Sequence, residues 1–310
     1  MGTLEDFESA RPRLLAIAYR MLGAVSESED AVQETYLRWA RADRESIRVP
    51  AAWLTKVLTN ICLNSLTSAR ARREEYIGQW LPEPVLDGDP VVGPLETAEQ
   101  RESVSLAVLY LLEKLTPQER AVFVLKESFS HSHTEIAEIL EISTANSQQL
   151  FSRAKRHLAD AKRSAEVDRD AAERIIKEFL KAASSGDTET LVALLTSDAV
   201  VIGDGGGVVT AARKPVLGAE RVAKLITGLF RPSQRQLEMI GGLPDLYFTY
   251  ANGTPSLAIT VGEKVVGVIA FSFEGGSVSA IHDAVNPGKL TAFERAWNSF
   301  DHGEPLHSFE

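Results

Sequence analysis

The sequence predicts a multidomain chain in which two all-α modules, a three-helix bundle and then a helix-turn-helix, precede an α+β domain. Apolar side chains recur at helical spacing through residues 3–75 and 99–163. Between these segments, residues 77–98 contain four prolines and three glycines, which is typical of a linker. After about Asp168, two helical stretches lead into short β-branched and glycine-rich runs, which favours an α+β domain.

The length of 310 residues suits two or three domains. No apolar run reaches the ~18 residues that a membrane helix needs, and the N-terminus lacks the apolar core of a signal peptide. Cys62 is the only cysteine, so no intrachain disulfide can form, which fits a reducing compartment. We therefore expect a cytoplasmic protein with no membrane partner.

The net charge of −10 is unevenly distributed. Residues 1–73 have 11 basic and 9 acidic side chains, and residues 101–163 have 9 basic and 8 acidic ones. The acidic excess lies in residues 74–100, which have 7 acidic and no basic side chains, and in the C-terminal half. Both helical modules are therefore slightly basic, which permits binding to DNA but not strong binding through charge alone.

The first module should contain three helices. An amphipathic stretch stops near Gly23, and Ser26 with Glu29 predicts a capping box at the start of the second helix. Pro50 suits the first turn of a third helix that continues to about residue 76. One face of this third helix is polar and is followed by arginines: Lys56, Asn60, Asn64, Thr67, Arg70, Arg72 and Arg73. Such a stripe fits a nucleic-acid strand and a plain solvated face equally well.

The second module should contain helices at 99–114, 117–128, 133–140 and 144–163. Residues 141–143 form a tight turn before the last helix, with Ser143 as its N-cap. One arc of that helix is suited to packing, and the other has donors for base edges and phosphates: Gln148, Gln149, Ser152, Arg153, Lys155 and Arg156. This pattern favours a DNA-binding helix-turn-helix over a simple helical hairpin. Glu141 and Ser147 are unusual, because glycine and an aliphatic residue are common at these positions.

The C-terminal segment should form a curved antiparallel sheet. Helices are expected at 169–184, 187–196 and 218–230. Strands are expected at 199–203, 206–212, 237–241, 246–251, 256–261, 264–273 and 277–285.

Three segments together resemble regions 2 and 4 of an extracytoplasmic-function sigma factor. They are residues 30–42 (DAVQETYLRWARA), 53–73 (WLTKVLTNICLNSLTSARARR) and 115–158, which includes the helix-turn-helix. Three further motifs resemble the subgroup that has a fused SnoaL-like C-terminal domain, a conical α+β barrel. These motifs are WLPEP at residues 80–84, DGGG at 204–207 and NPGKL at 286–290. The resemblance covers nearly the whole chain.

The resemblance implies a role for each matching position. Contact with the polymerase clamp is implied for Asp30, Gln33, Glu34, Leu37 and Trp39. Binding of the melted −10 strand is implied for residues 43–49 and for Lys56, Asn60 and Asn64, and the polar stripe adds Arg70 and Arg73. Recognition of the −35 element is implied for Ser143, Asn146, Gln148, Gln149, Ser152, Arg153 and Arg156. Regulation is implied for Trp80, Pro82, Glu83, Pro84, Asp204, Gly205, Gly206, Gly207, Asn286, Pro287 and Lys289.

Some positions depart from the subgroup pattern. Asn64 and Thr67 replace an Asp and a basic residue in the third helix, and Gln148 replaces a common Arg. Val208 stands where a Lys is usual and Gly288 where an Asp is usual. Without that Lys, an ionic contact to Glu83 is not expected, so we expect apolar packing to dominate around Trp80.

The predicted domains are region 2 (1–76), an acidic linker (77–98), region 4 (99–165), the SnoaL-like domain (168–300) and a tail (301–310). The resemblance implies a sigma factor whose partners are core RNA polymerase, promoter DNA at the −10 and −35 elements, and a small ligand of the C-terminal pocket. We expect no catalytic residue, cofactor or metal. His131 and His133 have a spacing that could touch a metal, but no cysteine or carboxylate set accompanies them.

Two alternatives remain. The first is a SnoaL-like small-molecule enzyme fused to a DNA-binding module. Its candidate pocket groups are Asp204, Asp245, Tyr247, His282 and Asp283, because a carboxylate and a histidine near a cavity can act as acid and base. The second is an activator that binds DNA without polymerase. The helical segment 1–73 argues against the activator, which has no need of a polymerase-binding region.

Overall fold

A computed structural model describes residues 4–74, 76–93, 102–158 and 167–309. The chain divides into two compact units. The first contains residues 1–75, 88–104 and 108–161, and the second contains residues 76–87, 105–107 and 162–310. Within the described residues, no helix is both long and apolar enough to span a lipid bilayer.

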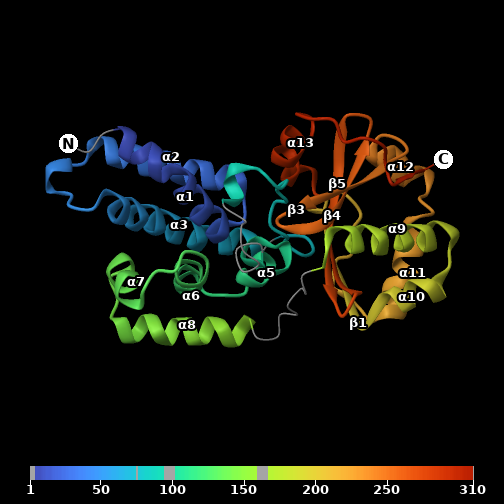
Figure 1. Cartoon of the computed structure of the whole chain (residues 1–310), viewed down its shortest axis with the longest axis horizontal. Coiled ribbons are helices and arrows are strands. Elements are labelled where there is room, and N and C mark those ends of the chain that lie inside the picture. Colours follow the sequence, from blue (N-terminus) through green and yellow to red (C-terminus); the bar gives the residue numbers. More distant parts are fainter. Residues whose placement is uncertain (1–3, 75, 94–101, 159–166, 310) are drawn as a thin grey trace. The chain divides into compact units, whose positions relative to one another are not determined.

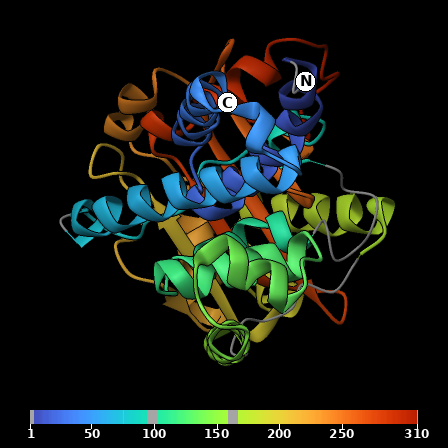
Figure 2. The same cartoon turned by 90° about the vertical axis from the view of Figure 1, so that its left-hand side faces the viewer.

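The first unit begins with three helices: α1 (Leu4–Leu22), α2 (Val25–Arg41) and α3 (Pro50–Glu74). Both views show α1 beside α2 and α3 (Figures 1 and 2), and α1 contacts each of them. The expected capping box at Ser26 is wrong. Helix α2 starts two residues earlier, after Ala24, and its N-cap makes no side-chain hydrogen bond. Ala24 and Val25 are both buried, so packing sets this helix start.

Further helical elements of this unit follow later in the chain, and Figure 1 labels the α-helices among them. They are η2 (Pro90–Val92), α5 (Leu106–Leu112), α6 (Pro117–Phe123), a π-helical turn (Val124–Ser128), α7 (His133–Leu140) and α8 (Thr144–Leu158). Capping boxes start α6, at Thr116 and Glu119, and α7, at Ser132 and Glu135. Helices α6 and α7 contact α3, so the predicted regions 2 and 4 pack within one unit.

The second unit contains a seven-stranded sheet with the order β2-β1-β6-β5-β4-β3-β7. Its strands are β1 (Leu195–Asp204), β2 (Val216–Leu217), β3 (Asp245–Ala251), β4 (Thr254–Val261), β5 (Lys264–Glu274), β6 (Ser277–Ala284) and β7 (His307–Ser308). The sheet is not wholly antiparallel as expected, because β1 and β6 pair in parallel. A long connection separates these two strands in sequence, which is what a parallel pair requires.

Helices cover the sheet: α9 (Arg169–Ser185), α10 (Thr188–Leu194), α11 (Ala219–Leu229), α12 (Gln234–Ile240) and α13 (Thr291–Trp297). Alternation along β4 separates two cores. Leu257 belongs to a large core with α9, α10 and α11, whereas Ala258 belongs to a smaller core with α13. The expected fold class, two helical modules followed by an α+β domain, is confirmed.

Two expected strands are wrong. Residues 206–212 form turns and irregular backbone, since Gly206 and Gly207 both have positive φ. Residues 237–241 belong instead to the end of α12, which starts with a capping box between Ser233 and Gln236 and stops at Gly241. The runs are too short for hydrophobic periodicity alone to separate a strand from a helix.

Candidate functional site

The helix-turn-helix has the local geometry that its sequence predicts. The Ser143 hydroxyl accepts a hydrogen bond from the Asn146 amide at 3.1 Å, which caps α8. Glu141 ends α7 in the left-handed conformation, with φ 55°. Ser147 is fully buried, and its hydroxyl lies 2.9 Å from His133 Nδ1. The hydrogen bond explains how a polar residue takes an inward position there.

Helix α8 exposes a polar face. Its buried residues are Ser147, Leu150 and Ala154. Lys155 is engaged within the protein, because its ammonium lies 3.3 Å from Glu127 and 5.0 Å from the Phe151 ring. The predicted −35 residues lie at the surface except Asn146, which is partly buried; the exposed ones are Ser143, Gln148, Gln149, Ser152, Arg153 and Arg156. These donors are available to a DNA groove.

The predicted −10 residues lie along α3 and in residues 43–49, which precede it and include the short 3-10 helix η1 (Arg44–Ser46). Asn64 is exposed, whereas Lys56 and Asn60 are partly buried. The Lys56 ammonium forms an ion pair of 2.8 Å with Glu141 in the helix-turn-helix. This hydrogen bond and the charge of Lys56 lower the pKa of Glu141. The side chains of Arg70 and Arg73 lie outside the described residues.

The predicted polymerase-binding residues on α2 divide into two groups. Asp30, Gln33 and Leu37 are exposed, and Glu34 pairs with Arg38 at 2.9 Å. Trp39 is 1% exposed and packs against Trp53, with ring centroids 5.5 Å apart. A direct contact between Trp39 and another protein would require the core to open. Trp39 would therefore contribute to polymerase binding only indirectly, through its packing within the helical module.

In the second unit, residues 76–87 lie against the α+β domain, and several of their hydrogen bonds meet at Asp204. We call the set of contacts between residues 76–87 and the α+β domain the linker clasp. The Asp204 carboxylate accepts hydrogen bonds from the Tyr76 hydroxyl at 2.5 Å, the Leu81 amide at 2.9 Å and the Lys289 ammonium at 2.7 Å. Lys289 also donates to the Leu81 carbonyl at 2.5 Å. Asn286 donates to the Tyr76 hydroxyl at 2.7 Å. Burial and the Asp204 hydrogen bond raise the pKa of Tyr76, so its hydroxyl keeps the donated proton.

The linker clasp continues as a short strand-like edge. The Val85 amide donates to the Asn252 side chain at 2.9 Å, and the Asn252 amide donates back to the Val85 carbonyl at 2.9 Å. Leu86 forms an isolated bridge with Ala251. Asp87 accepts from the Gly253 amide at 2.7 Å. Both backbone and side-chain hydrogen bonds therefore hold residues 85–87 against the α+β domain.

The expectation of apolar packing around Trp80 holds only in part. The Lys289 ammonium lies 3.1 Å from the centroid of the Trp80 ring, so a cation–π contact replaces a purely apolar one. Leu81, Pro82 and Pro84 are buried, and Glu83 is partly buried. Of the other predicted regulatory residues, Pro287 is exposed and Asn286 is partly buried.

The glycine motif allows close approach beside Asp204. The Gly206 amide donates to the Asp204 carboxylate at 3.0 Å, and a Cβ at Gly206 would lie 2.5 Å from Asn286 Nδ2. A Cβ at Gly205 would collide with the Val209 carbonyl. Side chains at either position would push the turn away from the clasp.

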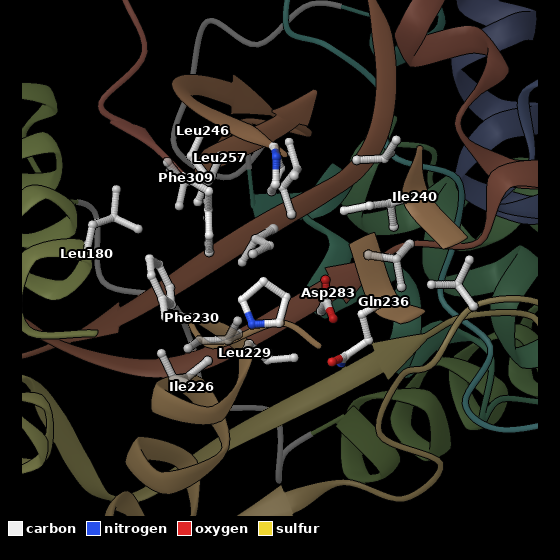
Figure 3. Close-up of a pocket in the computed structure, with 18 of the residues that line it drawn as sticks. Leu180, Ile226, Leu229, Phe230, Gln236, Ile240, Leu246, Leu257, Asp283 and Phe309 are labelled. Atoms are coloured by element: carbon white, nitrogen blue, oxygen red, sulfur yellow. The ribbon is translucent and has the colours of Figure 1, made fainter. Parts of the chain in front are cut away.

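A cavity of about 170 Å³ lies inside the α+β domain (Figure 3). Asp283 alone among the five candidate pocket groups lines it. Burial, followed by the charge of Asp204, raises the pKa of Asp283 to about 7. His282, the next residue of β6, is buried outside the cavity lining, and burial lowers its pKa to about 4.

The remaining candidates lie elsewhere. Asp245 accepts from the Ser308 hydroxyl at 2.5 Å, and Tyr247 packs against Trp297. Among the described residues, the cavity lining therefore contains one of the five candidate groups, Asp283, and no histidine. Within the described ranges, no group of three or more metal-binding side chains occurs, and His131 and His133 flank the N-cap of α7.

Sequence reasoning missed Tyr76, Leu81 and Asn252 as partners in the linker clasp. Tyr76 was expected at the end of a helix, and the Leu81 amide has no side-chain signal. Asn252 has φ 54° in a tight turn, and an Asn–Gly pair is a turn signal, but that signal does not identify a partner far away in sequence.

Comparison with known proteins agrees with this geometry. Residues 7–72 match the model of Sigma-70 region 2, and residues 105–158 match that of Sigma-70, region 4. The chain is 34% identical over 297 residues to the ECF RNA polymerase sigma factor SigJ of Mycobacterium tuberculosis, covering 93% of each chain. It is 32% identical over 287 residues to the probable ECF RNA polymerase sigma factor SigI of the same species, covering 90% of this chain and 92% of the relative.

A solved structure is also similar. The crystal structure of the extracytoplasmic function sigma factor SigJ from Mycobacterium tuberculosis matches with a TM-score of 0.72 and 31% sequence identity. The match covers 94% of this chain and 99% of that one. The helix-turn-helix, the three-helix module and the α+β domain all fall within this similarity. The chain therefore belongs to the extracytoplasmic-function family of RNA polymerase sigma factors, which direct core polymerase to promoter DNA.

Proposed function

We propose that this sigma factor reads the −35 element with α8, contacts the melted −10 strand with α3 and binds core polymerase through the exposed face of α2. The exposed donor face of α8 carries the proposal, because its arginines and amides can reach base edges in a major groove. The test is runoff transcription with core polymerase on a promoter selected by this protein. Absence of start-site-specific transcripts would contradict it.

The free protein should bind promoter duplex weakly. The two modules are nearly neutral, so few phosphates can be neutralised. The ion pair with Glu141 also engages Lys56. A mobility-shift titration with and without core polymerase tests this expectation. Nanomolar, sequence-specific binding by the free protein would support the activator alternative instead.

The α+β domain regulates this activity through the linker clasp. Residues 76–87 lie between the two predicted DNA-binding modules in sequence, and 12 extended residues reach about 40 Å. By their names, the two promoter elements lie roughly 25 base pairs apart, or about 85 Å of B-DNA. While residues 76–87 are docked on the α+β domain, they cannot extend. The connection between the two modules is then shortened by a large part of the distance that separates the two promoter elements. The clasp favours a restrained form until polymerase or a ligand shifts the balance.

The test of this regulation compares Trp80→Ala and a truncation before Asn286 with the wild type. Each variant should change both runoff transcription and the radius of gyration measured by scattering. Unchanged output and unchanged size in both variants would mean that the α+β domain is a passenger.

Three further assignments belong to the same proposal. The domain limits are those expected from the sequence, with regulatory residues on both sides of region 4. The protein acts in the cytoplasm, where bacterial RNA polymerase and promoter DNA are found. The cavity of the α+β domain takes a small ligand, because its lining is concave and mostly apolar with few polar groups.

A further inference from the structure

The cavity has one ionisable group in an apolar wall. Strand β6 contributes Ile281 and Asp283 to the lining, and Val285, the residue after the strand, continues the same alternation. Most of the remaining lining is aliphatic or aromatic, including Leu257, Phe271 and Phe309. Figure 3 shows the Asp283 carboxyl group directed into the cavity, whose labelled walls include Leu257 and Phe309. Within the described residues, no hydrogen bond to this carboxyl group is found.

The size and chemistry of the cavity restrict its ligand. A cavity of about 170 Å³ is close to the ~150 Å³ that accommodates benzene in another protein. An anion would be repelled by Asp283 and would lose its hydration in an apolar wall. A hydroxyl group suits Asp283 in either protonation state, because it donates to a carboxylate and accepts from a carboxylic acid. A pKa near neutrality makes both states accessible.

The cavity adjoins the linker clasp. Asp283 pairs in register with Gly203, the residue before Asp204, and the Val285 amide donates to the Asp204 carbonyl at 2.9 Å. Val209 and Thr210 line the cavity and also line a smaller polar pocket beside Ile77 and Gly78 of the linker. The loop after Asp204 therefore has the cavity on one side and the linker segment on the other.

We infer that the cavity binds a small neutral apolar molecule bearing one hydroxyl group, which bonds to Asp283, and that its occupancy stabilises the linker clasp. The ligand would fill the space beneath the loop 205–212 and fix its backbone against residues 76–87. Ligand binding in the cavity would thus act on the regulation proposed above, and its effect on transcription rests on that proposal. Binding and linker protection can be measured without transcription.

The first experiment titrates the full-length protein with p-cresol and with toluene, which lacks the hydroxyl group. We expect saturable p-cresol binding about tenfold tighter than toluene, as one hydrogen bond in an apolar site gives. Asp283→Leu should abolish the preference while still binding toluene, and Asp283→Asn should retain it. Glu263→Gln, at an exposed turn of the same domain, is the matched control and should behave as wild type.

The second experiment measures hydrogen exchange of the peptide covering residues 76–87. Saturating p-cresol should slow its exchange at least threefold in the wild type, with no change in Asp204→Asn, which weakens the clasp. A peptide from α7 should be unaffected. The inference is overturned if p-cresol shows no saturable binding, if Asp283→Leu keeps the preference, or if bound p-cresol leaves the linker peptide unchanged.

Its outcome is separable from the regulation proposed above. If Trp80→Ala alters transcription but p-cresol does not bind, regulation by the clasp stands and this inference fails. If p-cresol binds through Asp283 and protects the linker while clasp variants leave transcription unchanged, this inference stands and the regulatory proposal fails.

Discussion

Helix α8 and the linker clasp both depend on polar side chains, but they place them in opposite environments. The predicted DNA-contacting donors of α8 are exposed, so water can satisfy them at little cost to the folded protein. In the clasp, Asp204 is 1% and Lys289 6% exposed, and the two form a hydrogen-bonded pair. Exposed donors are available for a partner, whereas buried and satisfied ones fix the chain. Changes in α8 should therefore weaken binding, and changes in the clasp should weaken the fold.

The largest effect is expected for Asp204→Ala. The substitution leaves Lys289 as a buried charge without its ion pair and removes the acceptor for Tyr76 and Leu81. Breaking such a pair from one side costs about 3–5 kcal/mol of unfolding free energy. Denaturant-dependent hydrogen exchange of β1 and β6 peptides measures the loss in this domain.

The matched control is Asp301→Ala, in the same compact unit but on the surface. It should change the unfolding free energy by less than about 0.5 kcal/mol. Equal losses from the two substitutions would mean that the Asp204 cluster is no more important than a surface carboxylate, and the contrast between clasp and surface would fail.

The same contrast explains what the sequence could predict. The helix-turn-helix arises from local signals, namely a 3.6-residue periodicity and the Ser143 cap. The residues of its exposed face can therefore be predicted from the sequence alone. The motifs of the clasp could be named through family resemblance, but their geometry could not. Asp204 joins Tyr76 and Lys289, which are distant in sequence, and only the sheet brings them together. The Leu81 amide donates through its backbone, for which no residue type is a signal.

The second prediction concerns Asp283 and pH. Its pKa is raised to about 7 in the folded protein, whereas an unfolded Asp titrates near 4. The folded state therefore binds this proton more tightly. The stability that the protonated Asp283 carboxyl group contributes is fully present below about pH 4 and is lost as the pH rises to about 7. Asp283→Asn cannot ionise, so its unfolding free energy should exceed that of the wild type by about 4 kcal/mol at pH 8, since three pKa units correspond to that energy.

This difference should shrink toward zero as the pH falls to about 4. His282 also has a shifted pKa, but it is present in both proteins, so its contribution cancels in the comparison. Paired denaturation curves from pH 4 to pH 8 supply the measurement. A stability difference that does not change with pH would mean that Asp283 titrates normally.

A smaller effect is expected for Arg153→Ala on the exposed face of α8. If Arg153 reads a guanine, its loss should cost about 1–3 kcal/mol of transcription-complex stability on the cognate −35 element and relax base preference at that position. Lys155→Ala is the neighbouring control, because Lys155 already pairs with Glu127. Runoff transcription on promoters mutated base by base distinguishes the roles. A uniform loss across sequences would assign Arg153 to phosphate instead.

The smallest effect tests the one position where the helix-turn-helix departs from common turn chemistry. Glu141 adopts φ 55°, where a Cβ is unfavourable and glycine is not. Glu141→Gly removes that strain but also the ion pair with Lys56, which is exposed to solvent and therefore contributes little to stability. Glu141→Gln removes the charge and keeps the strain, so it isolates the two effects.

We therefore expect the unfolding free energy of Glu141→Gly to exceed that of Glu141→Gln by about 0.5–1 kcal/mol and to lie close to that of the wild type. Both variants release Lys56, so both should bind single-stranded −10 DNA equally well and slightly better than the wild type. Stability of the helical unit and a single-strand titration give the two readouts. If glycine is no more stable than glutamine, the turn relaxes without strain. If DNA binding is unchanged, Lys56 does not compete between Glu141 and the promoter.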